Sequence, residues 1–185
     1  MKTKLLALSL LLILAGMPLR ADFDFALQPV SGAISGTAES TIGWGYTLTN
    51  NDTDLWLLPA DLNADGFARA LAMPLFTFPA VAPGASLSVA FQADIDGLYQ
   101  ITWDADAPSG WTEYGFFRLN FDWWAGDPLN GGSFDSYAGY RELPYSAEVT
   151  AVPEPGAALL LFTAMIVVFS SRRLHLRGNQ TGGIK

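Results

Sequence analysis

Apolar side chains alternate with polar or small ones through the middle of this 185-residue chain, and this alternation limits the fold more than any other feature. It is clearest at Phe23, Phe25 and Leu27, and it recurs at 42–48 and 87–91. A period of two residues sends successive side chains to opposite faces of a β-strand, so that one face is buried while the other meets water. The alternation therefore predicts half-buried strands.

Turn-forming residues separate these stretches at short intervals. Clusters of Asn, Asp, Gly, Pro and Ser lie at 50–52, 82–84, 96–97, 108–110 and 130–132, and these residue types favour turns for steric or hydrogen-bonding reasons. Further strands are expected at 55–58, 74–79, 98–103, 113–121 and 145–150, and only a brief turn around 67–71 has a helical pattern. About seven to nine strands predict an all-β domain at 22–150, an antiparallel β-sandwich.

Residues 1–21 have the features of a secretory signal peptide. Two lysines precede an apolar run, Pro18 interrupts any helix there, and the segment ends at the small residue Ala21. Cleavage is expected between Ala21 and Asp22, during secretion through the general secretory pathway. The alternative is an uncleaved N-terminal anchor, although the apolar run is short for a bilayer.

At the other end of the chain, residues 151–177 combine a stiff break, an uncharged stretch and arginines. Pro153, Glu154 and Pro155 form the break, because each proline fixes its own φ and restricts the residue before it. Residues 156–171 carry no charge and would span about 24 Å as a helix, short of a hydrocarbon core of about 30 Å. The segment predicts a single short C-terminal transmembrane helix that anchors only marginally.

A cluster of basic residues follows the uncharged stretch. Arg172 and Arg173 follow it directly, and Arg177 lies four residues after Arg173. Such a cluster is retained on the cytoplasmic side of a membrane, which predicts that the N-terminal part of the chain lies outside. Residues 178–185 are expected to form a disordered tail.

The order of these features resembles the C-terminal PEP-CTERM sorting signal of Gram-negative bacteria, over residues 151–173. In that family the segment is understood to be recognised and cut by exosortase, a membrane-embedded cysteine protease or transpeptidase. Carried over to this chain, the resemblance implies that the Pro-Glu-Pro break is the recognition motif and that Arg172 and Arg173 are the stop signal. It also implies a transient anchor in the inner membrane, and a final location in the cell envelope or the extracellular matrix of bacteria that make exopolysaccharide. The alternative is an ordinary single-pass anchor in which the Pro-Glu-Pro segment is only a linker.

The segment between the two signals, residues 22–150, is strongly acidic. It contains 17 acidic and three basic side chains, a net charge of −14. Such a domain repels nucleic acid, which is therefore not expected as a partner. It attracts divalent cations and cationic matrix material. The PEP-CTERM resemblance implies exosortase as the processing partner, and exopolysaccharide or other matrix components as further partners.

The same segment contains no Lys, His or Cys. Ser-His-Asp and Cys-His catalysis, Schiff-base lysines, phosphate-binding loops and His/Cys zinc sites therefore each lack an essential member. Carboxylate chemistry survives, so a small glycoside hydrolase that uses two acids is the weakest of the alternatives. We expect no enzyme activity, no catalytic residues and no cofactor.

One carboxylate cluster has the spacing of the first half of a calcium loop. Asp61, Asn63 and Asp65 supply oxygens at the first, third and fifth positions, and Gly66 permits a sharp turn. The position of the bidentate Glu is occupied by Ala72, which excludes a complete EF-hand. A partial Ca²⁺ site completed from elsewhere is one interpretation, and a simple turn is the other.

The tryptophans offer another functional hypothesis. Trp111 and Trp124 lie in a stretch rich in Gly, Asp and Tyr, and exposed aromatic faces beside hydrogen-bonding groups stack on sugar rings. Trp123 and Trp124 must point to opposite faces of a strand, so only one of them is expected to be exposed. Trp44 and Trp103 lie in strand-like alternation and are expected in the core.

Together these features predict a secreted, envelope-sorted, non-enzymatic protein with a structural or adhesive role in the exopolysaccharide or biofilm matrix. A carbohydrate-binding module that uses Trp111 and Trp124 is the alternative.

Overall fold

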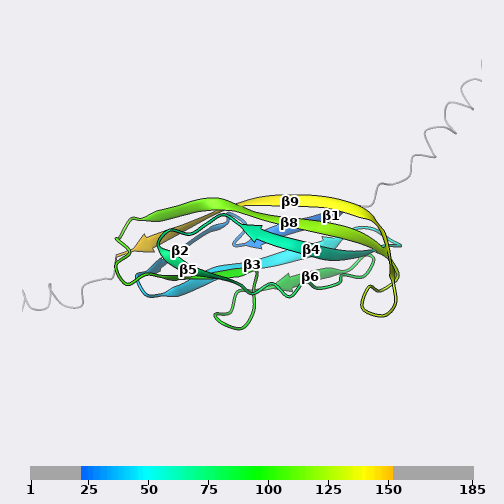
Figure 1. Ribbon diagram of the computed structural model, residues 1–185, viewed down its shortest axis with the longest axis horizontal. Helices are drawn as coiled ribbons and strands as arrows, with labels where there is room; N and C mark the ends of the chain where they lie inside the picture. Colours follow the sequence, from blue (N-terminus) through cyan, green and yellow to red (C-terminus); the bar gives the residue numbers. More distant parts are fainter. Residues whose placement is uncertain (1–21, 152–185) are drawn as a thin grey trace, which may run out of the picture. The chain divides into compact units, whose positions relative to one another are not determined.

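A computed structural model describes residues 22–151, and this part of the chain is all-β, with no helix (Figure 1). Its strands form two sheets. The first, here called the β3 sheet, holds β1 (Phe23–Gln28), β3 (Thr41–Asn50), β5 (Ala70–Pro74), β6 (Ser86–Val89) and β7 (Tyr99–Trp103). The second, the β8 sheet, holds β2 (Ala33–Thr37), β4 (Trp56–Ala64), β8 (Thr112–Ala125) and β9 (Ser133–Thr150). The predicted signal peptide at 1–21, and the sorting motif, membrane helix and tail from 152 onward, lie outside the described residues.

The strands pair almost entirely in the antiparallel direction. The order is β1-β3-β7-β5 in the β3 sheet, with β6 also paired to β3, and β2-β9-β8-β4 in the β8 sheet. Of these pairings, only β2 with β9 is parallel. The all-β prediction with antiparallel sheets is confirmed, apart from this one pair. A parallel pair needs a long connection, and most of the domain lies between β2 and β9 in the sequence.

The two sheets pack face to face, and aromatic side chains fill the space between them. Along β8 every second residue points inward, so Phe117 and Phe121 are fully buried. Phe23 of β1 meets Phe121 across the two sheets, with ring centres 4.5 Å apart. Trp44 and Trp103 are buried in the same core, as predicted. The arrangement is therefore sandwich-like.

Trp44 also ties the turn after β1 to the core. Its Nε1 donates a hydrogen bond to the backbone oxygen of Gly32 at 2.8 Å, and the same oxygen accepts from the Ser146 N–H of β9. Gly32 has a φ of 68°, and a Cβ there would lie 2.3 Å from the backbone oxygen of Pro144. Only glycine fits this position, and the contact holds the start of β2 beside β9.

The strand predicted at 74–79 is wrong, because β5 ends at Pro74. The apolar residues beyond it do alternate, but Pro79 has no N–H for a ladder and Phe78 has a left-handed φ of 53°. Phe76 nevertheless reaches the core from this loop. Alternation therefore predicts neither the conformation nor the burial of this loop, because Phe78 is 39% exposed while Phe76 is buried.

Three other elements depart from the sequence-based expectation. The helical turn predicted at 67–71 is instead the approach to β5, which begins at Ala70. The sequence analysis did not predict β2, and it placed the start of β9 at 145 rather than at Ser133. These missed segments carry mostly exposed or half-buried side chains, so they lack the apolar alternation that identifies a strand.

Candidate functional site

The face of the β8 sheet that is turned away from the core carries exposed aromatic side chains. Inward and outward positions alternate along β8, so the residues on either side of the buried Phe117 point outward. Six aromatics share this outer surface, which we call the aromatic face: Tyr114, Phe116, Trp124, Phe134, Tyr137 and Tyr140. Tyr114 is 73% exposed and Tyr140 is 62% exposed. Single exposed aromatics are common, whereas a set of them on one face indicates a binding surface.

Four of these rings gather around the end of β8 and the start of β9. Trp124 pairs with Phe134 across the strands, and the two rings meet edge to face with centres 6.2 Å apart. Asn120 pairs with Tyr140, and the Tyr137 hydroxyl donates to the Asn120 Oδ1 at 2.9 Å. Aromatic rings and a side-chain amide thus lie on one surface. This is the combination that stacks on a sugar ring and hydrogen-bonds to its hydroxyls.

Two polar groups near these rings lack protein partners. The Trp124 Nε1 is buried and makes no hydrogen bond within residues 22–151. Asp122 pairs with Tyr137 in the strand register, and burial raises the pKa of the Asp122 carboxyl above its usual range.

Arg118 lies between this cluster and Phe116. Its Nη1 is 2.6 Å from the Asp65 Oδ1, its Nε is 2.7 Å from the Glu142 Oε2, and its guanidinium carbon is 5.6 Å from the Phe116 ring centre. Hydrogen bonds from Arg118 and from the Phe116 N–H lower the pKa of the Asp65 carboxyl. Arg118 is therefore committed to protein partners and fixes the geometry of the face.

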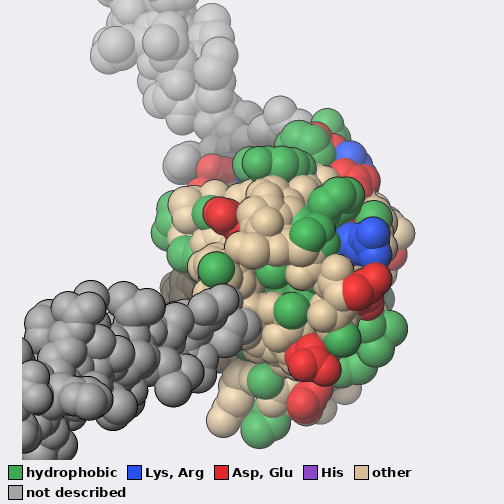
Figure 2. All heavy atoms as spheres, turned by 90° about the vertical axis from the view of Figure 1, so that its left-hand side faces the viewer, with side chains coloured by type: hydrophobic (Ala, Val, Ile, Leu, Met, Phe, Trp, Pro, Cys, Tyr) green, Lys and Arg blue, Asp and Glu red, His purple; other side chains and the backbone are tan. Residues whose placement is uncertain are grey.

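Every arginine in the described chain is engaged in this way. Arg69 pairs with Asp106 at 3.3 Å and Arg141 with Asp22 at 3.5 Å, as Arg118 does with its two carboxylates. In the view of Figure 2, basic side chains lie next to acidic ones, and other acidic side chains are spread over the surface. Most carboxylates have no basic partner among the described residues, so the surface potential is negative.

The structure separates the two tryptophans that the sequence singled out. Trp124 lies on the aromatic face, and Trp123 is buried, as the alternation requires. Trp111 precedes β8 at the opposite end, about 40 Å away along the strand at about 3.3 Å per residue. The Trp111 Nε1 donates to the Glu113 Oε1 at 2.9 Å, and the Arg69 guanidinium carbon lies 5.9 Å from the Trp111 ring centre. Trp111 therefore belongs to a structural contact and not to the aromatic face.

The candidate calcium residues do not form a loop. Asp61 and Asn63 lie in the extended strand β4, where the Asn63 Nδ2 donates to the Asp61 Oδ2 at 2.6 Å. Asp65 follows the strand and is held by Arg118 and by the Phe116 N–H. Within residues 22–151, no group of three His, Cys, Asp or Glu side chains is placed to hold a metal ion. The turn expected at 61–66 is wrong, because β4 stays paired with β8 as far as Ala64.

The sequence analysis missed five members of the aromatic face, and the strand pattern explains why. On β8, Tyr114 and Phe116 alternate with Glu113 and Gly115, so a period of two does not by itself show that these two rings point outward. On β9, register irregularities opposite Phe121 and Trp123 break the period of two. A signal that does not depend on the period was present, namely four aromatics within 134–145.

The part of the chain that the structure describes has no helix of the length and apolar character needed to cross a membrane. No protein-family model matches the sequence, and no curated protein matches it either.

Proposed function

We propose that the protein is a non-enzymatic, adhesive component of an exopolysaccharide matrix, and that it binds the polysaccharide through the aromatic face. The main support is the cluster of Trp124, Phe134, Tyr137 and Tyr140 beside Asn120 on one outer surface. These rings offer apolar planes for sugar stacking, and the amide and hydroxyl groups supply hydrogen bonds. No packing requirement of the core explains them, because they point away from it.

Catalysis is the weaker alternative. Residues 22–150 contain no Lys, His or Cys, so the common nucleophile and base combinations are missing. A glycoside hydrolase would need two carboxyl groups on either side of a bound sugar. Of the carboxylates on the aromatic face, Asp65 and Glu142 are neutralised by Arg118. Asp122 lies beside the ring cluster without a basic partner among the described residues.

The binding proposal is tested with purified full-length protein in gels that contain exopolysaccharide from the producing cells. We expect retardation of the wild type, and an affinity about fivefold lower for Tyr140→Ala, because one ring contact contributes about 1 kcal/mol. Trp124→Ala should weaken binding as well. Leu71→Ala is the matched control, since Leu71 is an exposed apolar residue on β5 of the other sheet. Failure of the wild type to bind any exopolysaccharide fraction, with circular dichroism showing folded protein, would rule the proposal out.

Sorting is the second part of the proposal. We infer that Pro153, Glu154 and Pro155 are recognised by exosortase, that Arg172 and Arg173 hold the transient membrane helix, and that the mature chain is released to the envelope or the matrix. The support is the order of the motifs in the sequence. Mass spectrometry of the C-terminus of the native protein should find chains that end near the Pro-Glu-Pro motif. Peptides that extend through Arg177 in the membrane fraction would show a lasting anchor instead.

A further inference from the structure

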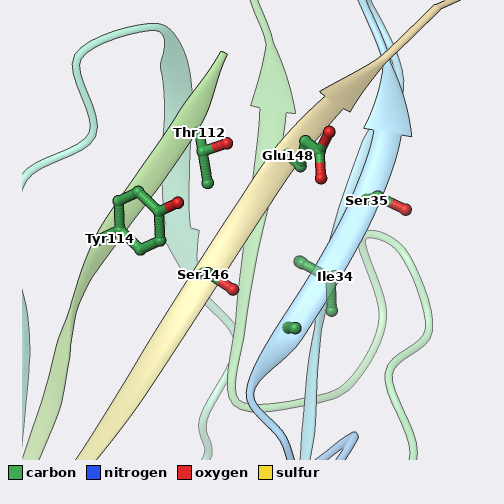
Figure 3. A pocket seen from close by; sticks show the side chains of 7 residues that line it. Ile34, Ser35, Thr112, Tyr114, Ser146 and Glu148 are labelled. Carbon is green, nitrogen blue, oxygen red and sulfur yellow. The ribbon is translucent and has the colours of Figure 1, made fainter. Parts of the chain in front are cut away.

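A shallow depression of about 280 Å³ lies on the outer surface of the β8 sheet where β2, β9 and β8 run side by side (Figure 3). We call it the Glu148 depression, and its lining residues come from these three strands: Ala33, Ile34, Ser35, Thr112, Tyr114, Ser146 and Glu148. Tyr114 is its aromatic wall and is also one end of the aromatic face. The depression therefore continues the proposed polysaccharide surface.

The strand register arranges the polar groups in two short rows. Glu148 pairs with Ser35 on β2 and with Thr112 on β8, so the carboxylate lies between two hydroxyls. Ser146 pairs with Tyr114 in the next outward row. Neighbouring strands are about 4.8 Å apart, so the row across three strands spans about 10 Å and the row of Ser146 and Tyr114 about 5 Å.

None of these polar side chains has a hydrogen-bond or ion-pair partner in the part of the chain that the structure describes. Among residues 22–151, the Glu148 carboxylate makes no ion pair and no hydrogen bond, and the hydroxyls of Ser35, Thr112 and Ser146 make none either. Surface hydroxyls elsewhere in the molecule do find partners, as the Thr41–Thr102 pair at 2.8 Å shows. The arginines that might neutralise Glu148 are all committed to other carboxylates.

We propose that the Glu148 depression binds an amino-sugar residue of a cationic polysaccharide, with its ammonium group on Glu148, its ring against Tyr114 and its hydroxyls on the serine and threonine side chains. This inference rests on the proposed function and adds the chemical class of the polysaccharide. The choice of a cationic sugar follows from charge complementarity, because Glu148 has no ion pair among residues 22–151 and residues 22–150 carry a net charge of −14. A neutral sugar would leave Glu148 without a charged partner.

The test compares a glucosamine tetramer with its fully N-acetylated counterpart, which has the same rings and linkages but no positive charge. Binding to full-length protein is measured by calorimetry at about pH 6, where carboxylates are ionised. We expect the wild type to prefer the glucosamine tetramer about tenfold, because a charge-assisted hydrogen bond is lost on acetylation. Glu148→Gln should abolish this preference.

Asp135→Asn is the matched control, since it removes the same charge from an exposed position near the start of β9 and leaves the depression intact. A preference that survives in Asp135→Asn and disappears in Glu148→Gln supports the inference. Equal loss in both variants would show that the domain attracts cations only through its overall charge. Equal binding of the two tetramers by the wild type would overturn the amino-sugar class while leaving the polysaccharide proposal standing. If neither tetramer binds, and exopolysaccharide binds the wild type but not Tyr140→Ala, the Glu148 depression is not a sugar site.

Discussion

The two outer surfaces of the domain face the same solvent but differ in chemistry. On the β3 sheet the outward side chains include short polar ones that pair with one another, as Thr49 with Ser86 and Gln28 with Ser88, both at 2.8 Å. The large apolar side chains exposed on its strands, Leu71 and Met73 of β5, are aliphatic and not aromatic. On the β8 sheet the outward side chains include large aromatic rings and a carboxylate, Glu148, with no protein partner in the described chain. Solvation alone therefore does not account for the aromatic face.

The comparison separates what stabilises the fold from what serves a ligand. A surface whose polar groups hydrogen-bond to each other needs no ligand to satisfy them. A surface that leaves rings, hydroxyls and a carboxylate unengaged gains favourable contacts only when a ligand arrives. Four predictions sharpen this contrast.

The largest effect is expected in the core that both surfaces share. Trp44→Ala removes a fully buried ring and its hydrogen bond to Gly32, so the free energy of unfolding should fall by about 3 to 5 kcal/mol. Urea denaturation followed by fluorescence measures it. Tyr114→Phe, an exposed change on the aromatic face, is the control and should leave the free energy of unfolding unchanged. A folded Trp44→Ala protein of unaltered stability would contradict this account of the core.

The next largest effect is expected in the pH dependence of the melting temperature, through an ion pair at the aromatic face. Arg118 lowers the pKa of the Asp65 carboxyl in the folded protein. The ionised carboxyl therefore stabilises the fold above the pKa of an unfolded Asp, about 3.9, and this stabilisation is lost as the pH falls through the lowered pKa of the folded state. Asp65→Asn should therefore have a lower melting temperature than the wild type at neutral pH, and the two should converge in acid. A difference that stays constant down to about pH 2 would mean that the ion pair is not its cause.

A smaller effect is expected on the hydroxyl side. Thr49→Val removes one partner of the pair with Ser86, and the free energy of unfolding should fall by about 0.5 to 1 kcal/mol. Ser86→Ala and the double variant complete a cycle that isolates the pair. None of the three should change polysaccharide affinity; if one does, the two outer surfaces are not functionally distinct.

The smallest effect is expected from calcium. Asp61 and Asn63 bond to each other in β4, and Asp65 bonds to Arg118, so no preformed oxygen cage exists at this place in the described chain. Millimolar calcium should leave the melting temperature unchanged, as followed by circular dichroism. A clear rise that is lost in Asp61→Asn would revive the calcium hypothesis.

Whether a residue's place in the fold could be predicted from the sequence depended on which face of its sheet it occupies. Inward positions such as Trp44 and Phe121 were predictable, because burial imposes a period of two. Asn50 was assigned to a turn by its residue type, yet it is fully buried at the end of β3, where its Nδ2 donates to the backbone oxygens of Leu55 and Val81. Only the fold reveals such partners. Of the aromatic face, the sequence predicted only Trp124. Burial requires apolar residues at inward positions, but it sets no such requirement at outward positions, so the outward rings follow no pattern.

If the chain is exported as proposed above, the parallel pairing of β2 with β9 has a consequence for the order of folding. β2 lies near the start of the domain, and its only strand partner in the described chain is the last strand, which ends at Thr150. A chain threaded through a membrane from its N-terminus would emerge with β2 unpaired until β9 had followed. The β8 sheet would then be completed only when the sequence next to Pro153 was already at the membrane. Under the sorting proposal, completion of the domain would coincide with the arrival of the Pro-Glu-Pro motif at the membrane.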